Sequence, residues 1–223
     1  MSAGNSRAVF SAQTEPHRDL GALLERHLRH PFRKPIADYN RAACDQALAA
    51  WRAWRPESGL ILDAGCGVGW STVNLARQFP ASFVLGVDQS ADRLGRERPA
   101  VGDLPANAAL VRADLVDFWR LLAAEKIRLE RHFLLYPNPW PKIGHLARRW
   151  HGHAVFPVLR ELGGSVECRS NWRIYVAEMA LALGRLAGRP VVCEPWVPPQ
   201  AMTPFERKYL ESGHPLWRCR AQL

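Results

Sequence analysis

Short apolar runs recur along the chain, and each is followed by a stretch whose apolar positions have helical spacing. The first four runs predict buried strands near residues 60–64, 82–87, 108–112 and 131–136. Between them, helices are predicted near residues 71–79, 90–97 and 115–125. Strands that alternate with helices indicate an α/β fold with a mostly parallel, doubly wound sheet that has helices on both faces.

The remaining part of the chain continues the same pattern. A helix ending at Leu162 is followed by the turn Gly163-Gly164, and the rest predicts strands near 165–169, 191–193 and 216–220 and a helix over 174–186. The complete sheet is therefore expected to have about seven strands. Ligands of such sheets bind beyond the carboxyl ends of the strands, so the residues that follow each strand are the candidates for function.

The N-terminal part differs from this core. Residues 20–34 have helical spacing with Arg and Lys interspersed, which fits either a basic arm that lies on RNA or a solvated helix face. Pro35 then opens a second helix over 36–54, because proline is favoured in a first helical turn. We expect residues 1–35 to form a basic, partly flexible arm and residues 36–223 to form a single domain.

Composition narrows the class of protein. The 223 residues are 48% hydrophobic, enough for one cored domain, and no apolar run has the length of a membrane span. The first residues lack the apolar region of a secretory signal, and the five cysteines are scattered, which favours a reducing cytoplasm. A net charge of +9 and a pI near 9.9 suggest a polyanionic partner, although an Arg-rich proteome would produce the same values.

A glycine-rich turn follows the first predicted strand. Asp63 ends the strand, Gly65, Gly67 and Gly69 allow a tight turn that a ligand can approach closely, and Asp88 closes the next strand. Trp70 stands where a dinucleotide-binding turn has its third glycine, which argues against a pyrophosphate. The turn resembles the first motif of S-adenosylmethionine (SAM)-dependent methyltransferases of the Rossmann-like class. The alternative is a tight strand-to-helix turn without a ligand.

Two further stretches follow strands. Asp114 comes after the third strand, where it can accept from the adenine amino group of SAM, cap the next helix, or do both. The fourth strand runs into Tyr136-Pro137-Asn138-Pro139-Trp140-Pro141-Lys142, whose prolines stiffen a loop of the kind that mounts catalytic groups. If a helix follows, His145, Arg148 and Arg149 share one face of it. That face either binds RNA phosphates or is a charged surface exposed to solvent.

Several stretches together resemble one family in order and spacing, the bacterial tRNA (guanine-N(7)-)-methyltransferases. The resemblance extends over residues 58–219 and rests on Pro137-Asn138-Pro139-Trp140-Pro141-Lys142, His145, Arg148-Arg149, Ser170-Asn171-Trp172 and Thr203-Pro204-Phe205-Glu206-Arg207. It implies a Rossmann-like, SAM-dependent enzyme of tRNA modification that transfers a methyl group to ring nitrogen 7 of a guanine in tRNA. A cytoplasmic monomer or homodimer that binds tRNA through a basic surface is expected.

The resemblance also implies roles for individual residues. The expected SAM-binding residues are Asp63, Gly65, Gly67, Gly69, Asp88, Asp114 and Asn138. The expected catalytic residues are Asn138, Asn171, Thr203 and Glu206. The expected substrate-binding residues are Trp140, Lys142, His145, Arg148, Arg149, Thr203, Glu206 and Arg207, of which Thr203 and Glu206 would help to hold the target guanosine. No metal is expected, because His145, His151 and His153 have no carboxylate or cysteine nearby in the sequence to complete a ligand set.

Two departures from the family pattern leave alternatives open. The family has Asp where this chain has Asn138 and Asn171. Methylation of guanine N7 needs alignment more than a general base, but its product is cationic and a carboxylate would stabilise it better than an amide does. The loop Asn138-Pro139-Trp140 also partly matches that of methyltransferases acting on exocyclic or small-molecule amines. A third possibility is a protein that binds SAM and RNA without catalysis.

Overall fold

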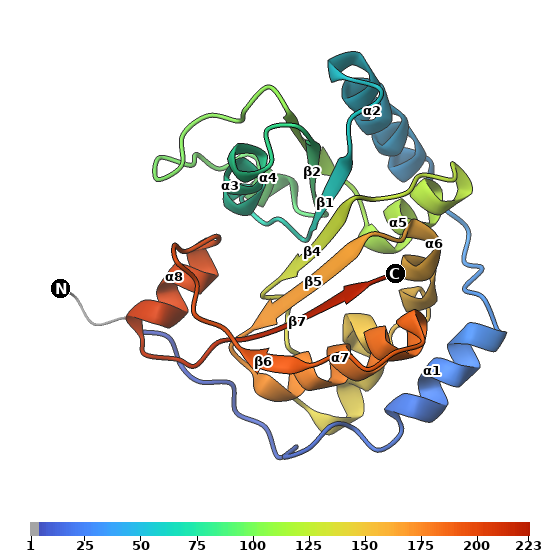
Figure 1. Cartoon of the computed structure of the whole chain (residues 1–223), viewed down its shortest axis with the longest axis vertical. Helices are drawn as coiled ribbons and strands as arrows, with labels where there is room; N and C mark the ends of the chain where they lie inside the picture. Colours follow the sequence, from blue (N-terminus) through green and yellow to red (C-terminus); the bar gives the residue numbers. More distant parts are fainter. Residues whose placement is uncertain (1–4) are drawn as a thin grey trace. The chain divides into compact units, whose positions relative to one another are not determined.

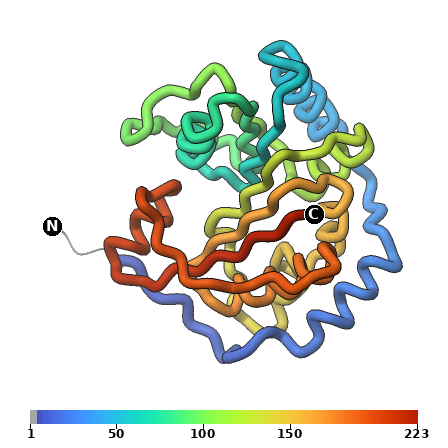
Figure 2. Tube along the Cα trace, viewed as in Figure 1, coloured from blue at the N-terminus to red at the C-terminus, as the bar shows by residue number. Residues whose placement is uncertain are grey.

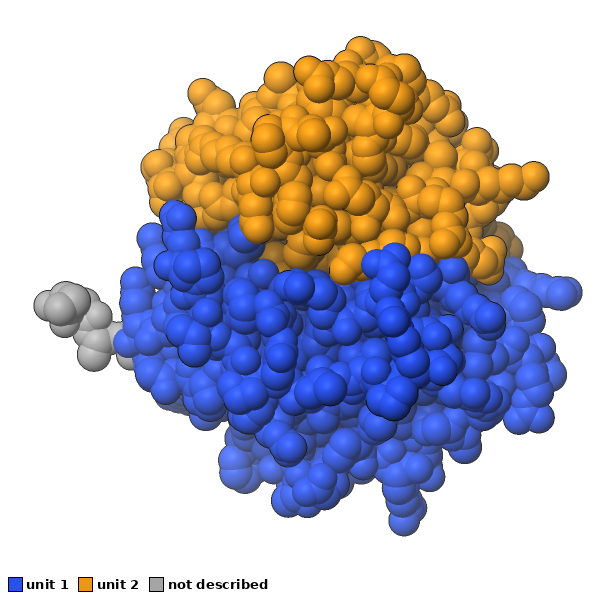
Figure 3. Space-filling view, in the orientation of Figure 1, with its two compact units in different colours: residues 1–33, 136–160, 166–223 blue, residues 34–135, 161–165 orange. Residues whose placement is uncertain are grey.

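The computed structural model describes residues 5–223, and the chain divides into two compact units. One unit, called unit 2, comprises Lys34–Leu135 and Glu161–Ser165. The other, unit 1, comprises the described residues up to Arg33 together with Tyr136–Arg160 and Val166–Leu223. Figure 3 distinguishes the two units by colour. Within residues 5–223, no helix is long and apolar enough to cross a membrane.

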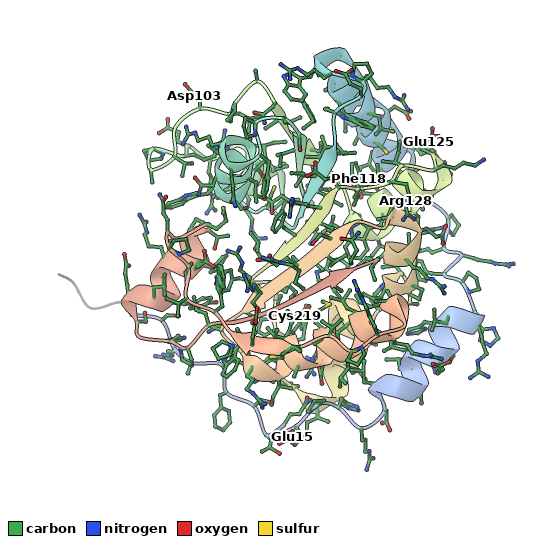
Figure 4. The ribbon with its side chains drawn as sticks, viewed as in Figure 1. Glu15, Asp103, Phe118, Glu125, Arg128 and Cys219 are labelled. Atoms are coloured by element: carbon green, nitrogen blue, oxygen red, sulfur yellow. The ribbon has the colours of Figure 1, made fainter. Side chains whose placement is uncertain are left out.

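Unit 2 contains four parallel strands in the order β3-β2-β1-β4 (Figure 1). Their bounds are β1 Leu60–Ala64, β2 Phe83–Asp88, β3 Ala108–Arg112 and β4 Arg131–Leu135. All residues of β1 and β2 are buried, as expected for strands covered on both faces. The helices that follow or precede them are α2 Asp38–Trp54, α3 Trp70–Gln78, α4 Ala91–Leu94 and α5 Leu115–Ala124. Phe118 of α5 is fully buried (Figure 4).

Unit 1 contains the later strands and the N-terminal helix. Its strands are β5 Ser165–Ser170, whose first residue belongs to unit 2, β6 Cys193–Pro195 and β7 Trp217–Gln222. Strand β7 pairs antiparallel with β6, and Cys219, in register with Cys193, is fully buried (Figure 4). Its α-helices are α1 Leu20–Arg29, α7 Arg173–Ala187 and α8 Pro204–Glu211, and its 3-10 helices are η1 Ile143–Arg148, η2 Trp150–Gly152 and η3 Phe156–Val158. The short helix α6 Leu159–Leu162 falls on the boundary of the units.

The strand order of the sheet is β3-β2-β1-β4-β5-β7-β6, which confirms the predicted seven-stranded, mostly parallel α/β fold. Most predicted elements lie within two residues of those observed. The strand predicted at 191–193 is observed two residues later, at Cys193–Pro195, because pairing with β7 begins only at Cys193. The condition of an α-helix directly after the proline-rich loop is not met, since the three short 3-10 helices η1, η2 and η3 follow it instead.

Residues 5–33, drawn in blue in Figure 2, belong to unit 1. Leu20 and Leu24 of α1 are buried, and the helix contacts α7, η2 and η3. The basic residues Arg26 and Arg29 lie in its last turn, where they complement the negative end of the helix dipole. Residues 1–4 of the predicted arm lie outside the described residues, and the division of the chain into an arm and a single domain stays a prediction.

Candidate functional site

The glycine turn of unit 2 connects β1 to α3. Gly65, Gly67 and Gly69 have φ values of 77°, 60° and 77°, a left-handed backbone that glycine adopts without steric cost. The backbone N–H of Gly65 donates to the carbonyl oxygen of Val87 at 2.8 Å, and that of Gly67 donates to Oδ2 of Asp88 at 3.0 Å. The turn is therefore fixed to the carboxyl end of β2.

The three glycines serve different purposes. A Cβ added at Gly67 would meet no heavy atom within 4 Å, and one at Gly65 would meet only Leu115 Cδ1 at 4.0 Å. At Gly69 a Cβ would lie 2.8 Å from a methyl carbon of Leu110, so a glycine is needed here to let the Leu110 side chain pack against the turn. Gly65 and Gly67 thus leave a backbone surface open to close approach, as a SAM cradle requires.

Asp63 lies beneath the turn and is 1% exposed. Its Oδ2 accepts hydrogen bonds from Ser71 Oγ at 2.6 Å and Thr72 Oγ1 at 2.7 Å, which ties β1 to the first turn of α3. Burial raises the pKa of Asp63 to about 6, against the lowering effect of these two hydroxyl groups. Thr72 can approach the strands because β2 has Gly86, where a Cβ would lie 2.1 Å from Thr72 Oγ1.

The two other predicted carboxylates also have protein partners. Asp88 accepts from Gly67 N–H through Oδ2 and from Ser90 N–H through Oδ1 at 2.9 Å. Asp114 caps α5 by accepting from Val116 N–H at 2.8 Å, so the predicted capping interaction is confirmed. Asp63, the glycines, Asp88 and Asp114 all belong to unit 2. Their predicted contacts with SAM stay predictions.

The proline-rich loop Tyr136–Lys142 belongs to unit 1. Tyr136 and Trp140 have φ values of 53° and 45°, which are strained conformations for side chains of this size. Asn138 lies between them with an exposed side chain, and its Oδ1 accepts from Trp140 N–H at 3.4 Å. Asn138, the predicted catalytic amide, is therefore an exposed residue between the two strained residues of the loop.

Two residues after Asn138, the half-buried His145 and the exposed Arg148, lie against the Trp140 ring. His145 makes an edge contact with it at 5.6 Å between ring centroids, and the Arg148 guanidinium lies 4.8 Å from the ring centroid. Desolvation and the positive charges of Arg148 and Lys142 lower the pKa of His145. Arg148 and Lys142 are exposed, as RNA contact requires.

The prediction that Arg149 contacts RNA was wrong. The side chain is fully buried, and its Nη1 donates to Glu178 Oε2 at 2.6 Å. The predicted helical face that would have placed Arg149 beside Arg148 does not form, because a 3-10 helix ends at Arg148 and the chain is extended at Arg149. Arg149 is therefore an internal ion-pair partner.

Glu206 also requires a correction, because it is fully buried rather than accessible to guanosine. Its Oε1 accepts from Tyr136 Oη at 2.6 Å, Arg169 Nη1 at 3.2 Å and Trp196 Nε1 at 3.2 Å, and its Oε2 accepts from Met202 N–H at 2.6 Å. It holds the first strained residue of the loop. The position of Glu206 three residues after the capping Thr203 accounts for its bond to the nearby Met202 N–H, but it gives no signal for the contact with Tyr136.

The other predicted residues of unit 1 lie near α8. Thr203 caps this helix by accepting from Glu206 N–H at 2.9 Å. Arg207 is exposed, with its Nε 3.9 Å from Glu211. Asn171 follows β5, and its Nδ2 lies 3.1 Å from Nδ1 of His214. The roles of these three residues in substrate binding or catalysis stay predictions.

Sequence reasoning missed the residues that support the site from within. Ser71 and Thr72 were detectable, because they directly follow the turn and begin the helix. Arg169, Glu178 and Gln13 carry no such signal, since their partners stand far away in the chain and no spacing rule connects them.

The fold agrees with that of known methyltransferases. An antibiotic-related methyltransferase superposes with a TM-score of 0.56 at 15% identity, covering 86% of this chain and 97% of that one. The 16S rRNA (adenine(1408)-N(1))-methyltransferase from Catenulisporales acidiphilia, solved with SAM, superposes with a TM-score of 0.54 at 21% identity, covering 78% and 90% of the two chains. The fold is thus that of the Rossmann-like methyltransferases, as predicted.

Sequence comparison identifies the family. A family model described as "Putative methyltransferase" matches residues 57–219, and the chain belongs to this family. A tRNA (guanine-N(7)-)-methyltransferase from Bordetella parapertussis is 28% identical over 97% of this chain and 92% of its own length. One from Burkholderia ambifaria is 29% identical over 70% of this chain and 64% of its own length. These relatives confirm the resemblance that the motifs predicted.

Proposed function

We propose that this protein transfers a methyl group from SAM to ring nitrogen 7 of a guanine in tRNA. The observation that carries the proposal is the extent of the likeness to the Bordetella relative, which includes 97% of this chain and therefore both units. The likeness thus extends over the glycine turn as well as the loop that carries Asn138. A cytoplasmic location, as a monomer or homodimer, belongs to the same proposal.

The cofactor fits unit 2. SAM supplies an electrophilic methyl group, and the open backbone at Gly65 and Gly67 would let its methionine part approach the chain. Asp88 would accept from ribose hydroxyl groups in addition to the backbone N–H groups it already holds. Asp63 would act from beneath, because its oxygen holds the start of α3 rather than facing the open side.

The amides of unit 1 suit the chemistry of guanine N7. This nitrogen carries a lone pair and no proton, so transfer depends on alignment and on exclusion of water rather than on a general base. As the new bond forms, the base becomes cationic, and carbonyl oxygens stabilise that charge. Because the His214 Nε2 lies 3.1 Å from the carbonyl oxygen of Ser6, its Nδ1 accepts from Asn171 Nδ2, which leaves the Asn171 oxygen as the group offered to a base.

Exposed cations of unit 1 support binding of an RNA backbone. Lys142, Arg148 and Arg207 are exposed, and the whole chain carries a net charge of +9. A base could stack on the Trp140 ring only if the side chain of Arg148 or His145 moved away, since both contact that ring. We assign Lys142, Arg148 and Arg207 to phosphates and Thr203 to the neighbourhood of the target nucleotide.

The test is methyl transfer from labelled SAM to unmodified tRNA, followed by nucleoside analysis. The expected product is 7-methylguanosine. A different methylated nucleoside would overturn the assignment to N7 and favour the amine reaction at Asn138. Binding of both SAM and tRNA without any product would overturn the enzyme assignment and favour a non-catalytic RNA-binding protein.

A further inference from the structure

A buried carboxylate connects three separate segments of unit 1. Glu178 of α7 is fully buried, and its Oε1 accepts from Gln13 Nε2 at 2.6 Å and from His17 N–H at 2.8 Å. Its Oε2 accepts from Arg149 Nη1 at 2.6 Å and lies 2.8 Å from His151 Nε2. Both oxygens are thus hydrogen-bonded twice, which balances the cost of burying the charge.

Arg149 extends this connection to the proline-rich loop. Its Nε and Nη2 both lie 3.2 Å from the carbonyl oxygen of Trp140, and its Nη2 also reaches Lys142 O at 3.4 Å and Gln13 Oε1 at 2.9 Å. The guanidinium additionally lies 4.9 Å from the centroid of the Trp172 ring. The planar fork of arginine can hold these groups together, whereas lysine offers no such geometry.

Arg149 holds Trp140, whose backbone conformation is unfavourable without support from its surroundings. Trp140 has a φ of 45°, and such a backbone costs about 1–3 kcal/mol unless the surroundings impose it. The N-terminal segment contributes a second restraint, because Ser11 Oγ donates to the carbonyl oxygen of Pro141 at 2.6 Å. Two segments distant in the sequence therefore fix the loop from which Asn138 projects.

We propose that Gln13, Glu178 and Arg149 are positioning residues that hold the 137–142 loop in the conformation needed for methyl transfer. The N-terminal segment is then part of the machinery that sets turnover, rather than only a basic arm for RNA. This inference rests on the proposed function for its kinetic consequence, but its structural consequence, restraint of the loop, can be measured without any reaction.

The primary variant is Gln13→Ala, because it leaves the Arg149–Glu178 ion pair intact. We expect kcat for tRNA methylation to fall roughly tenfold, since small misplacements of reacting groups cost this much or more. The KM for tRNA and the Kd for SAM should change much less than kcat, within about twofold of the wild-type values, because Gln13 itself is assigned to neither binding surface. Ser11→Ala, which removes only the bond to Pro141, should lower kcat by a smaller factor in the same direction.

The activity-independent measurement is hydrogen exchange of the peptide covering residues 138–153. Exchange should rise in Gln13→Ala and Ser11→Ala, while exchange of the α8 peptide 204–211 stays unchanged. The matched control is Glu25→Gln, which removes a half-exposed carboxylate paired with Arg185 on the same unit and should change neither kcat nor exchange.

The outcomes separate the two claims. Unchanged exchange of residues 138–153 in both variants would overturn the positioning role, whatever the wild-type activity. An active wild type with unchanged kcat in both variants would overturn its catalytic consequence. Absence of 7-methylguanosine from the wild-type reaction, with increased loop exchange in the variants, would support the restraint and overturn the proposed function alone.

Discussion

Asp63 in unit 2 and Glu178 in unit 1 are both buried carboxylates, yet their surroundings have opposite electrostatic effects. Asp63 accepts from two neutral hydroxyl groups, and burial raises its pKa to about 6. Burial also acts to raise the pKa of Glu178, but hydrogen bonds and charges from His151 and Arg149 outweigh it and lower the pKa to about 2. The pKa values differ in direction because neutral hydroxyl groups offset little of the cost of burying Asp63, whereas the cation Arg149 favours the charged form of Glu178.

The difference follows from what each carboxylate supports. The turn above Asp63 takes its left-handed conformations at glycines, which need little external restraint. The loop connected to Glu178 takes them at Tyr136 and Trp140, where the strain must be balanced by surrounding contacts. The cationic Arg149 therefore donates to the carbonyl oxygen of the strained Trp140, whereas two hydroxyl donors suffice beneath the glycine turn.

The largest effect is expected from Asp63→Ala. Ser71 and Thr72 are buried, so their hydroxyl groups would lose their acceptor, and the free energy of unfolding should fall by about 2–4 kcal/mol. The start of α3 and the glycine turn would shift, and SAM affinity should fall about 100-fold or more, equivalent to about 3 kcal/mol. Calorimetric titration with SAM measures this loss.

The matched variant Asp63→Asn keeps an oxygen that accepts from both hydroxyl groups. It should bind SAM much more tightly than Asp63→Ala does. Wild-type affinity in Asp63→Ala would show that the glycine turn needs no support from beneath and would remove Asp63 from the cofactor site.

The pH dependence of stability should differ between the two carboxylates. Folded Asp63 keeps its proton up to about pH 6, whereas its ordinary pKa is 3.8, so between these values the folded state binds more protons. Raising the pH from 4 to 6 should therefore lower the free energy of unfolding by about 2 kcal/mol through Asp63. Urea unfolding of wild type and Asp63→Asn from pH 4 to 7 isolates this contribution as their difference.

Glu178 should act in the opposite direction. Its folded pKa of about 2 lies below the ordinary 4.5, so its contribution is complete above pH 4.5 and is lost as the pH falls toward 2. This acid loss should persist in Asp63→Asn. A constant difference between wild type and Asp63→Asn from pH 4 to 7 would contradict the raised pKa of Asp63.

The smallest effect is expected from Arg148→Ala. Arg148 is exposed and Arg149 is buried, so removal of Arg148 alone should weaken tRNA binding severalfold. The slope of log affinity against log salt should become shallower by about 0.7–0.9, the value for one phosphate contact. Electrophoretic or fluorescence titration at several salt concentrations measures both.

The control for this measurement is Arg52→Ala, an exposed arginine of α2 to which we assign no RNA contact. Its salt slope should equal that of the wild type. An identical slope in Arg148→Ala would return Arg148 to the interpretation of a solvated charge.

The sequence alone was sufficient to predict the fold and the glycine turn. Strands β1 to β4 and the glycine turn are local features, because burial of apolar runs and the backbone freedom of glycine act between neighbours in the chain. The order Asp63, Gly65, Gly67, Gly69 and Asp88 could therefore be interpreted directly.

The tertiary structure decided which charged residues lie inside. Arg148 and Arg149 are adjacent and identical in type, yet one is exposed and the other is fully buried against Glu178. Glu206 likewise turned inward to Tyr136 and Arg169. Such choices depend on partners far away in the sequence, and burial of a charge is tolerated only where those partners meet it, so no local pattern could have revealed them.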